Sequence, residues 1–218
     1  MVVSEENAER GTRNAERLFW YDEYETARPL RSFLPTAAKV LFRPRRFFAR
    51  LDPEGSFLTG LAFASVCVGV YAALSTVSSA MVEVVLRGAT LTTPNVIGAT
   101  LANVGASVLA VWLLTPIAAA VYHLTVRLLV GRTNRGYRAT FRVITYSGAT
   151  DLVGWLPFVG PLVACAWALY LGTLGLRELH MTTTRRALAA VLVPTGTVAS
   201  LGVGWLLFGA AALELIRR

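Results

Sequence analysis

Three polar residues that could carry a proton or bind a cation lie within apolar stretches of this sequence: Asp151, His123 and Asn103. An ionised carboxylate in such a stretch is costly unless it faces other helices, a partner or water. Asp151 is therefore either a proton or cation site or a protonated or hydrogen-bonded group that fixes packing, with Ser147, Asn103 and Ser107 as candidate partners. In the first case, Asp151, His123 and Asn103 would line a polar path between helices.

Metal-dependent and covalent chemistry is not indicated by the other reactive side chains. His123 and His180 each lack a second ligand at helical spacing, and Cys67 and Cys165 lie in separate apolar runs. The common phosphate-binding, metalloprotease, serine-hydrolase and dithiol motifs do not occur. An intramembrane aspartyl protease would need a second buried aspartate opposite Asp151. We therefore expect no catalytic residue, no metal, no cofactor and no enzymatic activity.

The composition indicates that lipid surrounds most of the chain. Hydrophobic residues make up 55% of the sequence and charged residues 16%, which is outside the usual range of soluble proteins. The net charge is +8, but the basic residues separate apolar runs and form no stripe interleaved with aromatic residues, so nucleic-acid binding is not expected. Twenty arginines against one lysine are typical of a GC-rich, bacterial gene.

Two segments precede the expected transmembrane domain, which covers residues 53–218. Residues 1–32 are polar and are expected to form a cytosolic tail, either mobile or docking a protein partner. Residues 33–52 combine four phenylalanines with basic residues, as in an amphipathic helix lying on anionic lipid, and Pro44 would kink this helix or begin a second one. The predicted lipid-headgroup contacts are Lys39, Arg43, Arg45, Arg46 and Arg50.

The expected architecture is an all-α, polytopic membrane bundle of five transmembrane helices. A helix needs about 20 apolar residues to cross the hydrocarbon layer. The third and fourth spans are expected to form a hairpin, because Pro157 ends one helix, Gly160 relaxes the turn and Pro161 suits the start of the next. In the alternative, four spans cross the membrane and the third segment is re-entrant. The predicted spans are about 57–82, 96–126, 137–156, 160–177 and 187–213.

The distribution of basic residues favours five spans. With a cytosolic N-terminus, and counting from Lys39 onward, thirteen basic residues then face the cytosol and three face outward. The four-span alternative turns the last connection outward and changes the split to twelve and four. The polar, mixed-charge N-terminus is unlike a cleaved signal peptide. We therefore expect a multi-pass protein of the bacterial inner membrane, with its N-terminus in the cytosol.

Two stretches resemble the Yip domain family, membrane proteins named for their interaction with Ypt/Rab GTPases. These are LFRPRRFFARL before the first span and the long stretch from Thr140 to Pro194, with its aromatic-proline hairpin, Trp167 and Gly175. The resemblance covers roughly residues 38 to 210. It implies a five-span helical bundle with a cytosolic N-terminal region, and eukaryotic relatives are associated with vesicle trafficking, Rab binding and membrane shaping.

Two functions remain open from the sequence. The first is a non-enzymatic membrane organiser or adaptor, whose basic helix contacts a bilayer with anionic headgroups. Its further partner would be a protein bound by the N-terminal tail or a second copy of this chain. The second is a small permease or a lipid- or ion-handling transporter that uses Asp151.

Overall fold

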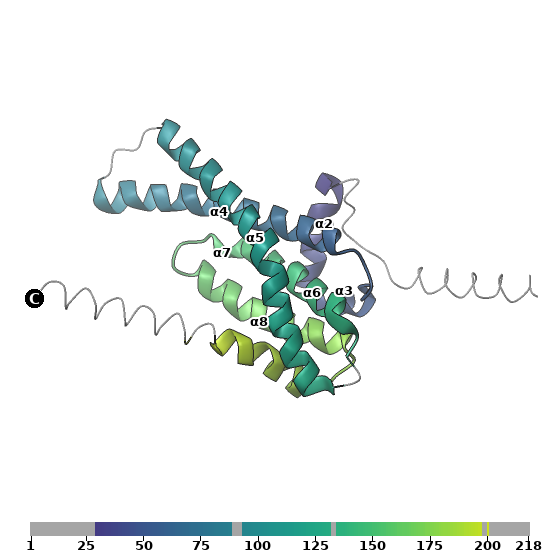
Figure 1. Cartoon of the computed structure of the whole chain (residues 1–218). Helices are drawn as coiled ribbons and strands as arrows, with labels where there is room; N and C mark the ends of the chain where they lie inside the picture. Colours follow the sequence, from purple (N-terminus) through teal and green to yellow (C-terminus); the bar gives the residue numbers. More distant parts are fainter. Residues whose placement is uncertain (1–28, 89–92, 132–133, 198–199, 201–218) are drawn as a thin grey trace, which may run out of the picture.

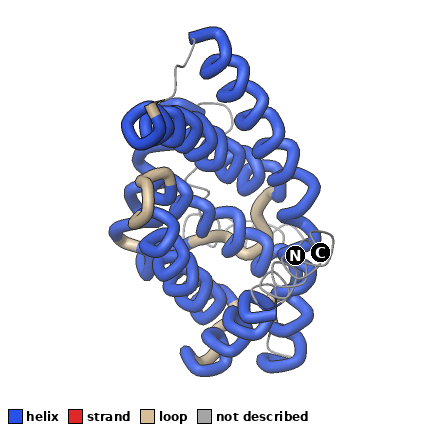
Figure 2. The backbone as a smooth tube through the Cα atoms, turned by 90° about the vertical axis from the view of Figure 1, so that its left-hand side faces the viewer, coloured by secondary structure: helices blue, strands red, loops and turns tan. Residues whose placement is uncertain are grey.

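The computed structural model describes residues 29–88, 93–131, 134–197 and 200, and every regular element in this part of the chain is a helix. In chain order the elements are α2 (Pro29–Phe42), α3 (Pro44–Arg50), α4 (Phe57–Arg87), α5 (Thr93–Val130), α6 (Gly136–Ser147), the 3-10 turn η2 (Gly148–Thr150), α7 (Asp151–Gly154) and α8 (Gly160–Leu179). A last described helix covers 184–197. Figure 1 shows α4 and α5 as a long antiparallel pair that extends beyond the shorter helices, and Figure 2 shows the same helices from the side.

Three of the described helices are long and apolar enough to cross a membrane. They are Phe57–Arg87, Pro94–Val130 and Gly160–Leu179. They contain the first, second and fourth predicted spans, so the expectation of an all-helical chain with apolar membrane helices is confirmed. The last predicted span, 187–213, lies partly outside the described residues, as does most of the predicted tail, 1–32.

The third predicted span, 137–156, is an interrupted helix and does not belong to this set. It consists of α6, η2 and α7. The first part, α6, is polar and contains Arg138, Thr140 and Arg142. This composition is tolerated because α6 packs against α4, α5 and α8, so that protein rather than lipid covers it. Arg142, Thr140 and Tyr146 are completely buried.

The basic amphipathic segment predicted at 33–52 is two helices, α2 and α3. The backbone bends at Arg43, with φ −134° and ψ 46°, and Pro44 begins α3, as the sequence predicts. Phe33 and Phe47 are buried against the bundle: the ring centroids of Phe33 and Phe63 are 5.7 Å apart, and those of Phe47 and Tyr146 are 5.1 Å apart. Protein therefore covers much of the apolar face that the sequence suggested for lipid.

α4 runs parallel to α6 and α7 and then continues past them. A Cβ atom on Gly60 would meet the side chain of Thr145, and Ser78 Oγ donates a hydrogen bond to the carbonyl of Trp155 at 3.3 Å. From Ser78, α4 continues to Arg87, a rise of about 13 Å at 1.5 Å per residue. Along the axis of α4, the turn between α7 and α8 therefore lies about 13 Å short of the C-terminal end of that helix.

α6–α7 and α8 form the predicted helical hairpin, and both of its ends lie on one side of the bundle. The backbone N–H of Arg135, just before α6, donates to Nδ1 of His180, just after α8, at 3.1 Å. The connections before α6 and after α8 therefore lie at the same end of the molecule.

Candidate functional site

The predicted headgroup contacts all lie on the protein surface. The side chains of Lys39, Arg43, Arg45, Arg46 and Arg50 are exposed, whereas Phe47 and Phe48 between them are buried. The reason is the period of the short helix α3, which turns its aromatic residues toward α6 and α8 and its arginines outward. The buried phenylalanines therefore fix the positive charges of this segment in place on the protein surface.

Basic residues from two further parts of the chain lie at the same end of the molecule as α3, and we call this end the basic end (residues 43–56, 134–142 and 177–186). Arg45 Nε lies 3.9 Å from Oε1 of Glu178, which is near the C-terminal end of α8. Arg138 donates a hydrogen bond to the carbonyl of Glu54 at 3.2 Å. Arg142 donates to the carbonyl of Ser56 at 3.0 Å. Because Ser56 caps α4 by accepting from the N–H of Leu58, these contacts tie the starts of α4 and α6 together.

Arg142 is completely buried, which its place among surface arginines in the sequence did not suggest. Its guanidinium lies under the backbone of Gly55, where an added Cβ would come within 2.5 Å of it, and its Cζ lies 5.4 Å from the ring centroid of Tyr146. A buried charge must be compensated by such contacts. We assign Arg142 to the architecture of the basic end rather than to lipid contact.

A chain of hydrogen bonds joins three helices beside the basic end. Thr140 Oγ1 lies 3.0 Å from His123 Nδ1 and 3.0 Å from His180 Nε2. Because the Arg135 N–H donates to His180 Nδ1, the proton of His180 is on Nε2, which donates to Thr140. The Thr140 hydroxyl then donates to His123 Nδ1. The sequence could not indicate this cluster, because its members come from α5, α6 and the end of α8.

Burial keeps His180 neutral in this cluster. Its side chain is fully enclosed, and burial, followed by the nearby His123 and Arg135, lowers its pKa from 6.5 to about 4. The unprotonated Nδ1 required by the Arg135 contact is therefore the stable form at neutral pH. Among the described residues no group of three metal-ligating side chains occurs.

The three residues of the predicted polar path, Asp151, His123 and Asn103, do not share hydrogen-bond partners. Asn103 donates to the carbonyl of Ala72 at 3.1 Å and to Thr76 Oγ1 at 2.9 Å, which joins α5 to α4. His123 belongs to the cluster with Thr140. Asp151 begins α7, where its Oδ2 lies 3.9 Å from the position of a Cβ on Gly148.

The suggested hydrogen-bond partners of Asp151 are engaged elsewhere or unpaired. Ser107 donates to Asn103 Oδ1 at 3.4 Å. The Ser147 hydroxyl is buried without a hydrogen-bond partner among the described residues. The polar groups that the sequence grouped together are therefore distributed over separate helix contacts.

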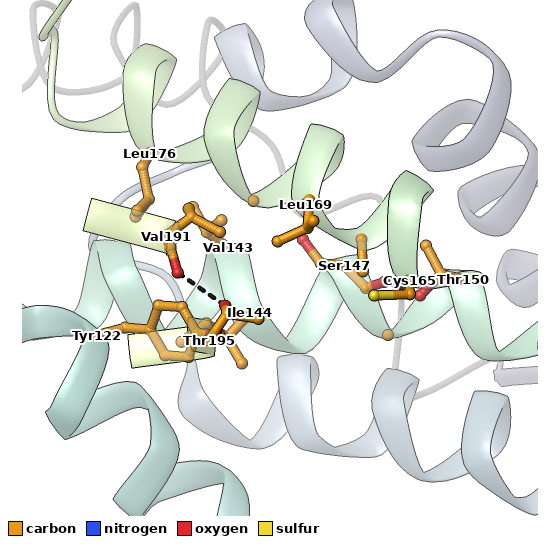
Figure 3. A pocket seen from close by; sticks show the side chains of 13 residues that line it. Tyr122, Val143, Ile144, Ser147, Thr150, Cys165, Leu169, Leu176, Val191 and Thr195 are labelled. Atoms are coloured by element: carbon orange, nitrogen blue, oxygen red, sulfur yellow. Dashed lines mark hydrogen bonds between the residues drawn. The ribbon is translucent and has the colours of Figure 1, made fainter. Parts of the chain in front are cut away.

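A mainly apolar cavity of about 250 Å³ lies between α5, α6, α8 and the helix over 184–197 (Figure 3). Its polar groups are few: the unpaired Ser147 hydroxyl, the Cys165 thiol, the Thr150 hydroxyl, which donates to the Ser147 carbonyl, and the hydroxyls of Tyr122 and Thr195, which are hydrogen-bonded to each other at 2.8 Å. Asp151, His123 and Asn103 are not in its wall. Such a lining suits a hydrocarbon chain better than an ion.

Comparison with known families gives one match. The Yip1 domain model matches residues 38–206, which is most of the chain and includes α3 to α8 and the helix over 184–197. No curated protein and no solved structure matches.

Proposed function

This chain belongs to the Yip1 domain family of membrane proteins, and from that premise we propose that it is a non-enzymatic membrane organiser or adaptor. The basic end would hold anionic lipid, while the N-terminal segment or a second copy of the chain supplies the protein contact. The observation that carries the proposal is the exposed set of arginines on α3, fixed to the bundle by buried Phe47 and Phe48. A mobile basic tail would not hold its charges in one place.

The same charges support a topology. The basic groups of 43–56, 134–142 and 177–186 lie at one end of the molecule, and the positive-inside rule assigns this end to the cytosol. We propose five spans in a bacterial inner membrane, with the N-terminus in the cytosol and the turn at 155–159 near the far leaflet. The part of α4 beyond Ser78 would then reach into the outer headgroup layer.

Impermeant labelling tests this topology. We expect a single cysteine at Phe158, which is 79% exposed in the α7–α8 turn, to react with an impermeant maleimide from outside intact cells, in a Cys67→Ser, Cys165→Ser background. A single cysteine at Arg185 should react only after the cells are opened. Reaction of the 158 position from the cytosolic side alone would show that the α6–α8 hairpin does not cross.

Charge reversal tests the function. We expect the triple variant Arg43→Glu, Arg45→Glu, Arg46→Glu to lose the cellular distribution and cross-linked partners of the wild type, because each basic residue near an anionic membrane surface contributes about 1 kcal/mol. The matched control is Arg127→Glu, an exposed arginine in the last turn of α5. Size-exclusion chromatography verifies folding. A folded triple variant with the wild-type distribution and partners would rule out this role for α3.

A lipid-handling transporter is the second candidate, and the apolar cavity of about 250 Å³ favours it over ion transport. Its wall includes the polar residues Ser147 and Cys165 but not Asp151. Transport of a lipid or small apolar substrate by the wild-type chain in sealed vesicles, abolished by filling the cavity at Ala168, would decide for this candidate over the organiser.

A further inference from the structure

Two adjoining grooves run along one face of α8 and share Phe42. The first, with a volume of about 420 Å³, lies between the α2–α3 bend and Tyr170, and its basic residues are Arg43, Arg45 and Arg46. The second, with a volume of about 210 Å³, lies between the end of α2, α7 and α8, and it includes Val163 and Trp167. Phe42 lines both grooves, and we call the two together the α8 groove.

The two parts of the α8 groove differ sharply in chemistry. The first is lined by three arginines and Tyr170, and its acidic neighbour is Glu178, 3.9 Å from Arg45, so the balance of charge is positive and suits an anion with several oxygen acceptors. The second is apolar apart from one threonine, Thr150, whose hydroxyl already donates to the carbonyl of Ser147 at 3.0 Å. A free phosphate would need only the first part, whereas an amphiphile would fill both.

The order of these parts along α8 matches the order of a lipid molecule. Val163, Trp167 and Tyr170 follow one another at helical spacing on one face, with Tyr170 nearest the basic end and Val163 nearest the α7–α8 turn. The ring centroids of Trp167 and Tyr170 are 5.2 Å apart, and both side chains are well exposed. The arginines of the first part lie toward the basic end and the apolar residues of the second part lie toward the α7–α8 turn, as the headgroup and acyl chain of a lipid would.

Phe42 supports the same assignment. Its side chain is 81% exposed although it lies between buried Val40 and Pro44, which is unfavourable for a phenylalanine in water. At the junction of the two parts, its ring would contact the first segments of an acyl chain. A protein segment would find only a short, shallow surface here, whereas a single lipid contacts the basic and apolar parts together.

We propose that the α8 groove binds one anionic phospholipid of the cytosolic leaflet, with its phosphate on Arg43, Arg45, Arg46 and the Tyr170 hydroxyl and one acyl chain beside Phe42, Val163 and Trp167. This inference rests on the proposed membrane function and adds to it a specific ligand, with stoichiometry of one. This stoichiometry distinguishes a bound lipid from the diffuse attraction that any basic surface exerts on a membrane.

The test is direct binding to the purified full chain in a non-ionic detergent. The probes are dioctanoyl phosphatidylglycerol, dioctanoyl phosphatidylcholine and inorganic phosphate, each followed by native mass spectrometry and titration calorimetry. We expect one molecule of the anionic lipid to bind at least tenfold more tightly than the zwitterionic lipid. Each of Arg43→Gln, Arg45→Gln and Arg46→Gln should weaken it about fivefold, as a contribution of about 1 kcal/mol per basic residue implies.

A pair of neighbouring substitutions tests the apolar part without changing any charge. Val163→Trp would fill the groove and should weaken the anionic lipid about tenfold, whereas Leu162→Trp, one residue earlier on α8 and 74% exposed outside the groove, should not. Equal binding of inorganic phosphate, or equal effects of the two tryptophan variants, would overturn the proposal. So would unchanged lipid binding in the three glutamine variants.

This test is independent of the cellular role. One anionic lipid can bind as described while the triple glutamate variant keeps its distribution and partners, in which case only the organiser function fails. Conversely, altered distribution without selective lipid binding would leave the organiser and remove the site. Monodisperse elution of each variant shows that a loss of binding is not a loss of folding.

Discussion

Replacement of Gly160 by alanine is expected to destabilise the α7–α8 hairpin by about 3 kcal/mol, at the upper end of the cost of overpacking. An added Cβ would lie 2.7 Å from the carbonyl oxygen of Gly154 and 2.8 Å from that of Val153. These are backbone atoms, which cannot rotate away as a side chain can. The end of α7 would therefore have to separate from the start of α8, and with it the turn that holds the hairpin.

Thermal unfolding of the detergent-purified chain, followed by circular dichroism and by proteolysis in the turn, measures this effect. The control is Gly98→Ala in α5, where an added Cβ meets nothing within 4 Å. Removing a glycine from an open helical position should stabilise the chain by about 0.5–1 kcal/mol. If Gly160→Ala and Gly98→Ala had the same effect, the close backbone approach at this turn would be disproved.

Acidification is expected to destabilise the protein through His180, by up to about 3 kcal/mol. The pKa of His180 is lowered from 6.5 to about 4, chiefly by burial. Between these two values the unfolded chain binds the proton and the folded chain does not, so the free energy of unfolding falls as the pH falls from 6.5 to 4. Above pH 6.5 the residue contributes no pH dependence, and below pH 4 the loss is complete.

The unfolding midpoint between pH 7.5 and pH 4 measures this dependence, and His180→Gln isolates the contribution of His180. Glutamine cannot be protonated in this range and can still hydrogen-bond to Thr140, so the variant should be less stable than the wild type at pH 7.5 but lose less on acidification. A parallel loss in both proteins would assign the acid sensitivity to other groups and contradict the neutral state of His180.

Much of the local structure could be predicted from the sequence because it depends on nearby residues. Charge-free runs long enough to cross a membrane predicted α4, α5 and α8. Pro44 predicted the break between α2 and α3, and the prolines at 157 and 161 predicted the turn before α8, because proline removes a backbone donor and restricts φ. Family membership followed from the order of these same elements and is confirmed over residues 38–206.

Other features depended on contacts between helices far apart in the chain. The role expected for Gly160 was a relaxed turn, but the residue instead allows two backbones to touch. The sequence did not indicate that Arg142 and Thr140 of the third span are buried, which is possible because neighbouring helices shield α6 from lipid. In the sequence His180 lacks a second metal ligand at helical spacing, whereas in the structure Thr140 and Arg135 lie beside it.

The sequence by itself determined that this is a helical membrane chain and where its long apolar helices lie. Only the tertiary structure decided which polar groups meet: it separated Asp151, His123 and Asn103, joined His123 to His180, and placed three arginines above an apolar face of α8. The physical reason is that hydrophobic periodicity reports which face of a helix avoids water, but not which helix that face contacts.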